Sequence, residues 1–466
     1  MTRRFAVRSI FSSFENLLLI NDLRCVSRSG MLSAIPQLMA MNLTQINATE
    51  ENNDRSVSRR KFLGVGSAAI GATMIAAATA AAQMPQDTEK AELDRSESSP
   101  LSPNEAINSK NTDSVIPPPT DHGDVKPFKY PFSFSHKRIQ EGGWAREVTI
   151  ADLPVSTTIA GVDMRLTAGG IRELHWHTAS EWALMLYGSA RITCLDQSGK
   201  PFVDDVKQGD LWFFPTGFPH SIQGLGPDGC EFLLVFDDGA FSEYDTVLLA
   251  DWLAKTPLSV LSKNLGVSKQ ALSTMPDHEL YIFQAEVPKT SLAEDRRAAA
   301  GDVGLSSQNF SFRMMEMQPT HKTKAGEVRI VDSNVFQASN AIAAAHVIVH
   351  PGGLRELHWH QNADEWQYYV AGKGRMTVFA AHGNARTMDF QEGDVGYVKQ
   401  TLPHYIENTG TEDLIFLEMF KSNQYQDVSL NQWLTHLPPG LVQAHLNIDL
   451  ATINAIPHSE EVVVPA

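Results

Sequence analysis

The sequence predicts an all-β protein with two tandem β-sandwich or barrel domains and helices only at their periphery. Two observations predict this fold: an internal repeat of a nine-residue histidine motif, and a series of short β-prone runs separated by Gly, Asp, Asn and Pro. The chain has 466 residues, 42% of them apolar and 20% charged, which is ordinary globular usage and leaves room for two or three domains.

The internal repeat is the strongest signal in the chain. Residues 169–177 read GGIRELHWH and recur as GGLRELHWH at residues 352–360, identical at eight of nine positions. Further matches follow at an offset of 184 residues: Glu181-Trp182 with Glu365-Trp366, Gly209-Asp210 with Gly393-Asp394, and Pro219-His220 with Pro403-His404. A duplication this regular indicates two copies of one domain.

Each copy is expected to consist of short β-strands. The β-prone runs are residues 190–195, 211–214, 232–236, 376–379 and 414–419. Many short strands with turn residues between them are typical of a sandwich or barrel. Residues 244–265 and 431–446 are expected to be helical and to pack outside the barrels.

The first 82 residues are expected to be a leader that is not part of the fold. Arg59 and Arg60 precede a weakly apolar stretch, Gly64 to Ala82, which resembles a twin-arginine export signal. Ala80-Ala81-Ala82 offers an A-x-A cleavage site. A retained membrane anchor is the alternative, because the stretch is about 19 residues long. The true start stays open, since Met41 would shorten an unusually long leader.

Export by this route would place the mature protein in the periplasm or outside the cell, without stable membrane association after cleavage. Residues 83–124 are rich in Glu, Ser, Asn and Pro and are expected to form a disordered linker. The expected folded parts are an N-terminal domain at 125–265, a connection at 266–310, and a C-terminal domain with a helical tail at 311–466.

The charge of the chain is strongly acidic outside the leader. Residues 1–82 hold nine Lys and Arg against five Asp and Glu, so with a total of −16 the remainder carries a net charge of −20. So acidic a body is a poor candidate for nucleic-acid binding, and we expect no nucleic-acid partner.

Two of the three cysteines, Cys194 and Cys230, would remain after cleavage. Both lie in the first domain, where they could form a disulfide in an exported protein or remain two buried thiols. Neither shows the spacing of a metal-ligand pair.

The repeated histidine motif predicts a metal site in each domain. Residues i and i+2 of a strand point to one face, so His175 and His177 turn inward while Trp176 points away. Glu181 and His220 are expected to complete the site from neighbouring strands. The same set recurs in the second domain as His358, His360, Glu365 and His404. A lone inward histidine is usually a core residue, but three with a carboxylate suit a divalent transition metal with open positions. Ligand type alone does not choose among manganese, iron, nickel and zinc.

These motifs resemble both sequence motifs of the cupin family, whose domains are jelly-roll β-sandwiches. In the first copy the resemblance covers residues 169–188 and 209–220. The second copy departs at one turn, where Lys399 and Thr401 replace Pro and Gly. Two such domains with the strand RELHWH, and with DDGAFSEYDT at residues 237–246, resemble the bicupin oxalate decarboxylases from about residue 126 to the C-terminus.

The resemblance implies manganese in each domain, hence two ions per chain, dioxygen as a further cofactor, a hexamer, and conversion of oxalate and a proton to formate and carbon dioxide. Arg172, three residues before the first histidine, can reach the far carboxylate of oxalate and polarise it as carbon dioxide leaves. Arg355 is its counterpart in the second domain. The alternative for these arginines is a strand-end salt bridge with Glu173 or Glu356.

The resemblance also assigns a role to Glu243, at the position of the family's mobile lid glutamate. A carboxylic acid closed over a dry metal site has a raised pKa and can act as a general acid. The family pattern resembles Ser-Glu-Asn-Ser-Thr, so Tyr244 and Asp245 depart from it by adding bulk and charge. The second barrel reads Lys-Ser-Asn-Gln-Tyr after Phe420, which favours the first domain as the main catalytic site. An ordinary exposed loop glutamate is the alternative for Glu243.

Oxalate decarboxylation is therefore the predicted function, and three alternatives remain. Oxalate oxidase, which gives hydrogen peroxide and carbon dioxide, would follow if proton delivery were lost. A bicupin storage protein typically lacks full ligand sets, whereas eight ligands are present here. Other cupin enzymes, such as dioxygenases or sugar isomerases, keep the ligands but not the paired arginines and the lid.

Overall fold

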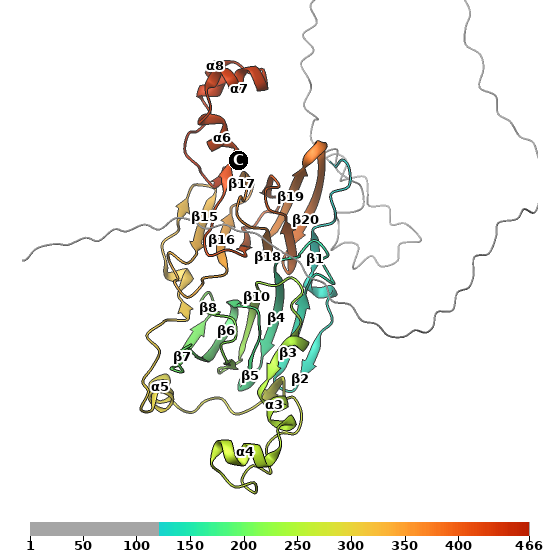
Figure 1. Ribbon diagram of the computed structural model, residues 1–466. Helices are drawn as coiled ribbons and strands as arrows, with labels where there is room; N and C mark the ends of the chain where they lie inside the picture. Colours follow the sequence, from blue (N-terminus) through green and yellow to red (C-terminus); the bar gives the residue numbers. More distant parts are fainter. Residues whose placement is uncertain (1–120, 466) are drawn as a thin grey trace, which may run out of the picture. The chain divides into compact units, whose positions relative to one another are not determined.

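The structure is a computed structural model that describes residues 121–465. The leader with its twin-arginine motif and nearly all of the expected linker lie outside the described residues. Within the described part, no helix is long and apolar enough to cross a membrane. Short strands form two successive barrels with a few helices at their ends, which confirms the predicted fold class (Figure 1).

The first barrel is organised around one long strand, β6. The first half of β6 pairs with β8 and β10 and its second half with β7 and β9, so a single strand passes from one sheet to the other. The strands are β2 (Arg138–Gln140), β3 (Gly143–Val148), β4 (Ala160–Leu166), β5 (Gly170–Trp176), β6 (Glu181–Leu195), β7 (Pro201–Lys207), β8 (Leu211–Phe214), β9 (His220–Gly224), β10 (Cys230–Phe236), β11 (Val247–Leu248), β12 (Ile282–Gln284) and β13 (Ser311–Phe312).

The second barrel repeats this plan but divides the long strand at Gly372. Gly372 has φ +83°, and a Cβ there would lie 2.4 Å from the carbonyl oxygen of Asp413, so this position requires glycine, as does the matching Gly188 inside β6. The strands are β1 (Lys129–Pro131), β14 (His321–Lys322), β15 (Gly326–Val331), β16 (Ala343–Val349), β17 (Leu354–Trp359), β18 (Glu365–Ala371), β19 (Lys373–Ala380), β20 (Asn384–Gln391), β21 (Asp394–Val398), β22 (His404–Asn408), β23 (Leu414–Phe420), β24 (Val428–Ser429) and β25 (Val463–Val464).

The sheets do not follow the domain boundaries expected from the sequence. The expected start at residue 125 puts β1 in the first domain, but β1 pairs with β21 of the second barrel. The expected start of the second domain at residue 311 puts β13 there, but β13 pairs with β8 of the first barrel. Each barrel therefore includes a strand from the other side of the connection. The β-propensity of a segment does not indicate which distant strand it will pair with.

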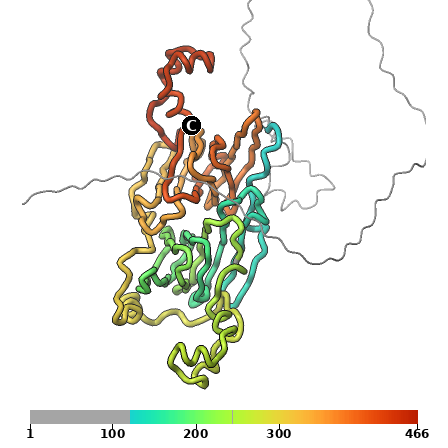
Figure 2. Tube along the Cα trace, viewed as in Figure 1, coloured from blue at the N-terminus to red at the C-terminus, as the bar shows by residue number. Residues whose placement is uncertain are grey.

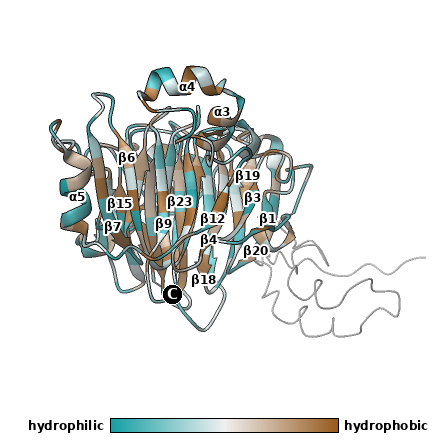
Figure 3. Ribbon diagram, turned by 90° about the horizontal axis from the view of Figure 1, so that it is seen from below, coloured by the Kyte–Doolittle hydropathy of each residue, from teal (hydrophilic) through white to brown (hydrophobic). Residues whose placement is uncertain are grey.

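One hydrophobic cluster extends from the first barrel into the second, and the second barrel also has a cluster of its own around Tyr369 and Phe416. Trp366 of the second barrel is fully buried and packs so close to Gly161 of the first that a Cβ on the glycine would lie 2.5 Å from the indole. The chain passes from the first barrel (green) through the connection (yellow) to the second barrel (orange), as Figure 2 shows. Apolar and polar positions alternate along many strands (Figure 3), and β8 and β23 are buried almost throughout because both of their faces are covered.

The predicted helical segments are helical but shorter and broken. In place of 244–265 and 431–446 the structure has α3 (Leu249–Lys255), α4 (Leu258–Leu265), α6 (Leu430–Thr435) and α7 (Pro439–Leu446), followed by α8 (Leu450–Asn454). The breaks fall at Pro257 and Pro438, because proline lacks an N–H and keeps the preceding residue out of the helical region. Residues 121–465 also contain four short 3-10 helices: η2 (Phe132–Phe134), η3 (Glu243–Asp245), η4 (Met314–Glu316) and η5 (Ala381–Gly383).

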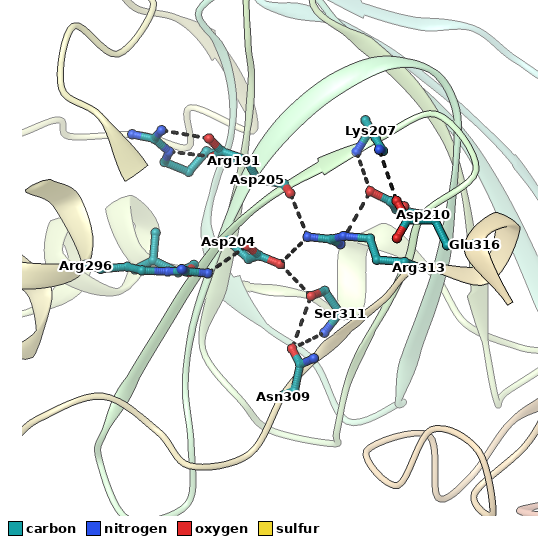
Figure 4. A network of polar contacts seen from close by, with 11 residues as sticks. Arg191, Asp204, Asp205, Lys207, Asp210, Arg296, Asn309, Ser311, Arg313 and Glu316 are labelled. Atoms are coloured by element: carbon teal, nitrogen blue, oxygen red, sulfur yellow. Dashed lines mark hydrogen bonds and ion pairs between the residues drawn. The ribbon is translucent and has the colours of Figure 1, made fainter. Parts of the chain in front are cut away.

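Charged side chains hold the connection against the first barrel. Helix α5 (Leu292–Ala300) begins with a capping box formed by Ser291 and Glu294. Arg296 of this helix donates to Asp204 of β7 at 2.8 Å, and Arg313 beyond β13 donates to the other oxygen of Asp204 at 2.7 Å (Figure 4). One buried carboxylate therefore binds both ends of the connecting segment.

Candidate metal centres

The first barrel brings together the four residues predicted as its metal ligands. His175 lies near the end of β5, His177 directly follows that strand, Glu181 begins β6 and His220 begins β9. Their ligand atoms all lie within 4.8 Å of one another, and no side chain is more than 3% exposed. The carboxylate of Glu181 lies 3.2 Å from Nε2 of both His177 and His220.

Backbone carbonyl groups fix the orientation of the three imidazoles. Nδ1–H of His175 donates to the carbonyl of Glu173 at 2.5 Å, that of His177 to Ala179 at 2.7 Å, and that of His220 to Phe218 at 2.7 Å. Because a carbonyl can only accept, each Nδ1 carries the proton, and each neutral ring offers the lone pair of Nε2 to the centre. Burial, helped by nearby Arg172, lowers the pKa of His175 well below its usual range.

The second barrel builds the same centre from its own copy of the motif. His358, His360, Glu365 and His404 are at most 3% exposed, and their ligand atoms also lie within 4.8 Å of one another. Their Nδ1 atoms donate to the carbonyls of Glu356, Gln426 and Leu402. The three Nε2 atoms and Oε2 of Glu365 are buried without a hydrogen-bond partner. Four such atoms facing one point are costly unless a cation takes their lone pairs, so this donor set fits a divalent metal.

The two glutamate ligands are supported by different donors. The indole N–H of Trp212 donates to Oε1 of Glu181 at 3.1 Å. In the second barrel the amide of Gln367 donates to Oε1 of Glu365 at 2.6 Å. Each bond occupies one carboxylate oxygen and leaves the other to face the histidines.

Arg172 lies beside the first centre and is 3% exposed. Its guanidinium carbon lies 4.4 Å from the centroid of the Tyr281 ring, and its Nη1 donates to the Tyr281 carbonyl at 3.2 Å. Tyr281 immediately precedes β12, whose Ile282 pairs with Arg172 itself. The connecting segment thus delivers the residue that holds this arginine.

Arg355, the counterpart in the second barrel, is fully buried among acidic partners. It forms ion pairs with Glu418 at 3.1 Å and Asp427 at 2.8 Å, and it donates to the Tyr425 hydroxyl at 2.7 Å. Burial raises the pKa of Glu418. At Asp427 burial also acts to raise the pKa, but the charges of Arg355 and His360 and the hydrogen bonds from Arg355 and Tyr425 together outweigh it and lower the pKa. Arg355 therefore forms ion pairs, as the alternative considered from the sequence allowed, but its partners are Glu418 and Asp427 and not Glu356.

Glu173 and Glu356, the salt-bridge partners considered from the sequence, anchor backbone segments. Glu173 accepts hydrogen bonds from the N–H groups of Ala250, Leu280 and Tyr281 at 2.7 to 2.8 Å. Glu356 accepts from the N–H of Val462 at 2.9 Å. Glu173 therefore holds helix α3 and the connection to β5, and Glu356 holds the segment before β25 to β17.

Comparison with known families settles the fold family. The cupin family model matches residues 132–272 and 312–454, which together make up more than half of the chain. The chain belongs to the cupin family. It carries two cupin domains, as the repeat predicted.

The relatives that match most of this bicupin are named oxalate decarboxylases, whereas three glucose-6-phosphate isomerases match only 15–18% of it. It is 53% identical over 339 residues to oxalate decarboxylase OxdC of Bacillus subtilis, covering 73% of this chain and 87% of the relative. It is 39% identical over 350 residues to a probable oxalate decarboxylase of Arthroderma benhamiae, covering 74% and 85%. A solved structure concerned with the Mn(II) centres of the Bacillus subtilis enzyme matches with a TM-score of 0.76 and 49% identity over 80% of this chain and 98% of that one. The predicted resemblance to bicupin oxalate decarboxylases is thereby confirmed.

The lid segment, residues 242–246, follows the last long strand of the first cupin domain. Glu243 begins the short helix η3, and the neighbouring Tyr244 is 86% exposed. Before the lid segment, the Phe241 ring stacks on Phe236 at 3.7 Å and also contacts His177. Phe241 therefore closes one side of the first centre and fixes where the lid segment begins.

The turn that departs from the cupin pattern keeps its shape in the second domain. The N–H of Gly217 donates to the carbonyl of His177, and the N–H of Thr401 donates to that of His360, both at 2.9 Å. Gly217 has φ +75° and Thr401 has φ +69°, so a β-branched residue is held in the left-handed region. The change strains one residue and leaves the metal ligands in place.

Several residues around the centres were missed in the sequence. Glu418 could have been found, because it is a lone acid in the apolar run Leu414–Phe420. Tyr281 gave no signal, since it comes from the connection a hundred residues beyond Arg172. The two cysteines are free and buried, and burial raises the pKa of the Cys230 thiol to about 12, so the buried-thiol alternative describes them.

Proposed function

We propose that this protein is an oxalate decarboxylase, which converts oxalate and a proton to formate and carbon dioxide. The observation that carries the proposal is a complete three-histidine, one-glutamate centre with Arg172 buried beside it, in a chain 53% identical to a named oxalate decarboxylase. Incubation of the purified protein with oxalate, with formate and peroxide both quantified, tests it. Formate as the main product supports the decarboxylase, whereas peroxide in its place would identify the oxidase alternative.

Manganese is the proposed metal, two ions per chain, with dioxygen as the further cofactor. The similar structure with Mn(II) centres and the two four-residue donor sets support it. When bound, the cation supplies Lewis acidity and open coordination positions for oxalate oxygens. Elemental analysis after manganese-supplemented expression should give close to two ions per chain, and a value fixed near one would show that one centre does not bind metal.

In the proposed reaction Arg172 binds the carboxylate of oxalate that lies farther from the metal. A planar guanidinium matches a carboxylate with two parallel hydrogen bonds, and its burial strengthens the attraction because water is excluded. Arg172 is pre-oriented by the Tyr281 carbonyl and ring, so little reorganisation is needed as charge shifts toward the departing carbon dioxide.

Glu243 is the proposed general acid for the carbon that remains. The proposal rests on its place in the lid segment, directly after the Phe241 contact with His177. Glu243→Ala should lower formate turnover by roughly 10²–10⁴-fold, the usual worth of general acid catalysis. Manganese content and oxalate binding should change little, because Glu243 is not in the donor set. Near wild-type formate turnover would show that the proton comes from another group.

Export by the twin-arginine route is proposed from the sequence alone, and a hexamer from the resemblance. Changing both Arg59 and Arg60 to Lys should leave active enzyme in the cytoplasm, and unchanged secretion would show that another signal operates. Because manganese binds more weakly than copper or zinc at such sites, loading before export of a folded protein would protect against the wrong metal. Light scattering of the purified protein tests the hexamer.

A further inference from the structure

The ring of Tyr281 lies between two arginines. The guanidinium carbon of Arg138 is 3.5 Å from the ring centroid and that of Arg172 is 4.4 Å from it. Two planar guanidinium groups this close to one centroid would collide on a single face, so they lie on opposite faces. The ring separates an arginine of β2 from the arginine of the first metal centre.

The backbone of Tyr281 is fixed, but its hydroxyl is not what orients the ring. Its N–H donates to Glu173, its carbonyl accepts from Arg172, and it holds φ +54°, a conformation rare for a tyrosine. The side chain is 1% exposed, and its hydroxyl has no hydrogen-bond partner. The stacking of two cations on its faces is therefore the specific interaction that holds the ring.

Arg138 is itself anchored from outside the centre. Its Nη2 donates to Glu279 at 2.7 Å, and this ion pair is partly exposed, with 24% of the Arg138 side chain accessible. Glu279 stands two residues before Tyr281 in the connection. The pair thus ties β2 to the segment that presents the ring.

We propose that Arg138 is a positioning residue for Arg172, acting through the Tyr281 ring, and that it sets the affinity of the first centre for oxalate. This inference rests on the proposed function and deepens it. An arginine binds a dianion more tightly when its side chain is already held in place before the dianion arrives. The Tyr281 ring can do this, because it holds the flat face of the Arg172 guanidinium.

The second barrel has no aromatic ring at the position that corresponds to Tyr281. Val462 takes the place of Tyr281 there: it has φ +61°, its N–H donates to Glu356, and its carbonyl accepts from Arg355 at 3.5 Å. Valine offers no ring, and Arg355 is held by Glu418 and Asp427. Of the two barrels, only the first, where Arg172 is proposed to bind substrate, has an aromatic ring stacked on this arginine.

The test compares Arg138→Leu with Lys137→Leu in manganese-loaded full-length protein. Lys137 is the matched control, because its ammonium lies 4.2 Å from the Trp144 ring in a similar cation–π pair one residue away. Arg138→Leu should raise the KM for oxalate by about tenfold and lower kcat by less than about threefold, since Arg172 is still present but must be ordered on binding. Lys137→Leu should leave both constants unchanged. Arg138→Lys, which keeps a cation over the ring, should recover part of the affinity.

Two further measurements separate positioning from general stability. A crystal structure of Arg138→Leu should show the Arg172 guanidinium displaced from the Tyr281 carbonyl. Glu279→Gln, which weakens the anchor at an exposed site, should raise KM by about threefold even if Arg138→Leu folds poorly. The proposal is overturned if KM stays at the wild-type value in Arg138→Leu and Glu279→Gln, or if Lys137→Leu raises it equally. A wild-type protein that does not turn over oxalate would instead remove the proposed function.

Discussion

The two barrels surround the same arginine with different partners. Arg172 and Arg355 stand at matching positions three residues before the first histidine of each centre. The guanidinium of Arg355 is neutralised by two carboxylates, whereas Arg172 packs on a tyrosine ring and donates to a backbone carbonyl. An incoming dianion would meet the charge of Asp427 at the second centre. The partners of this arginine therefore differ between the two centres, although the histidine motif is the same.

The acidic partners of Arg355 arise at two positions where the first barrel has neutral residues. Glu418 of β23 stands where β10 has Leu234, at the 184-residue offset of the repeat. Asp427 precedes β24 as Thr246 precedes β11, because Val428 and Val247 pair with equivalent tryptophans. The acidic partners of Arg355 are therefore not part of what the two copies of the domain have in common.

Removing Arg355 should have the largest effect on stability. Arg355→Met leaves two buried carboxylates unpaired and should lower the free energy of unfolding by about 3–5 kcal/mol. Adding Glu418→Leu and Asp427→Thr, which copies the first barrel, should restore most of that loss. Chemical denaturation of the single and triple variants measures both. A single variant as stable as wild type would mean that the acidic cluster is not a buried network.

Removing Arg172 should affect activity more than stability. Arg172→Ala should lower kcat/KM for oxalate by about 10²–10³-fold, the range seen when one donor to developing charge is lost. Its manganese content should stay at the wild-type value, because the four ligands are untouched. The control is the Arg355 triple variant, which should retain formate production. Equal losses in both proteins would show that both centres bind oxalate.

Asp163 on β4 and His346 on β16 stand at matching positions of the two barrels. They should make stability depend on pH in opposite directions. Asp163 and His346 each lie opposite an arginine, Arg146 and Arg329. Burial, reinforced by Glu231 and opposed by Arg146 and Lys137, raises the pKa of Asp163 to about 7, whereas burial lowers that of His346 to about 4.

The sign at Asp163 follows from its raised pKa. The folded protein holds this proton up to about pH 7 but the unfolded chain only to about pH 4, so the group destabilises the fold increasingly as pH rises between them. Asp163→Asn should therefore raise the free energy of unfolding by about 2–4 kcal/mol at pH 8 and hardly change it at pH 4. His346→Gln should raise the free energy of unfolding only at acidic pH. Thermal melts of both variants at the two pH values check this, and an equal gain for Asp163→Asn at both would contradict the assignment.

The smallest expected effect concerns the turn at Thr401. Thr401→Gly removes left-handed strain from a β-branched residue and should stabilise the protein by about 1 kcal/mol after the entropy lost by glycine. Gly217→Thr in the first barrel should destabilise by a similar amount. Denaturant midpoints for the two exchanges test the pair, and a destabilised Thr401→Gly would mean that the threonine side chain makes a compensating contact.

The metal ligands could be predicted because the information is local. His175 and His177 stand two residues apart at the end of β5, and the repeat in register identified Glu181 and His220 without any knowledge of the sheet. Strand identity followed in the same way, since β8 occupies the run 211–214 that composition singled out. Short-range patterns suffice where a strand carries both the pattern and the chemistry.

Long-range contacts could not be predicted from such patterns. The pairing of β1 with β21 joins segments more than 260 residues apart, and Tyr281 reaches Arg172 across 109 residues. The segment 244–265 was predicted as one helical piece, but Pro257 separates α3 from α4. Secondary-structure propensity describes a single segment of the chain. Strand pairing and the contact of Tyr281 with Arg172 depend on which distant segment lies beside it.

The exchange of β1 and β13 between the barrels constrains how the molecule can be assembled. During synthesis, Lys129–Pro131 emerge first but have no sheet to join until Asp394–Val398 have been made. The first barrel in turn waits for Ser311–Phe312, so neither half reaches its final form alone. A gene divided at the connection would give two fragments, each carrying a strand that belongs to the other. Such fragments would have to associate to cover their exposed sheet edges. The two halves of the duplication are therefore expected to fold correctly only as one chain or as an associated pair.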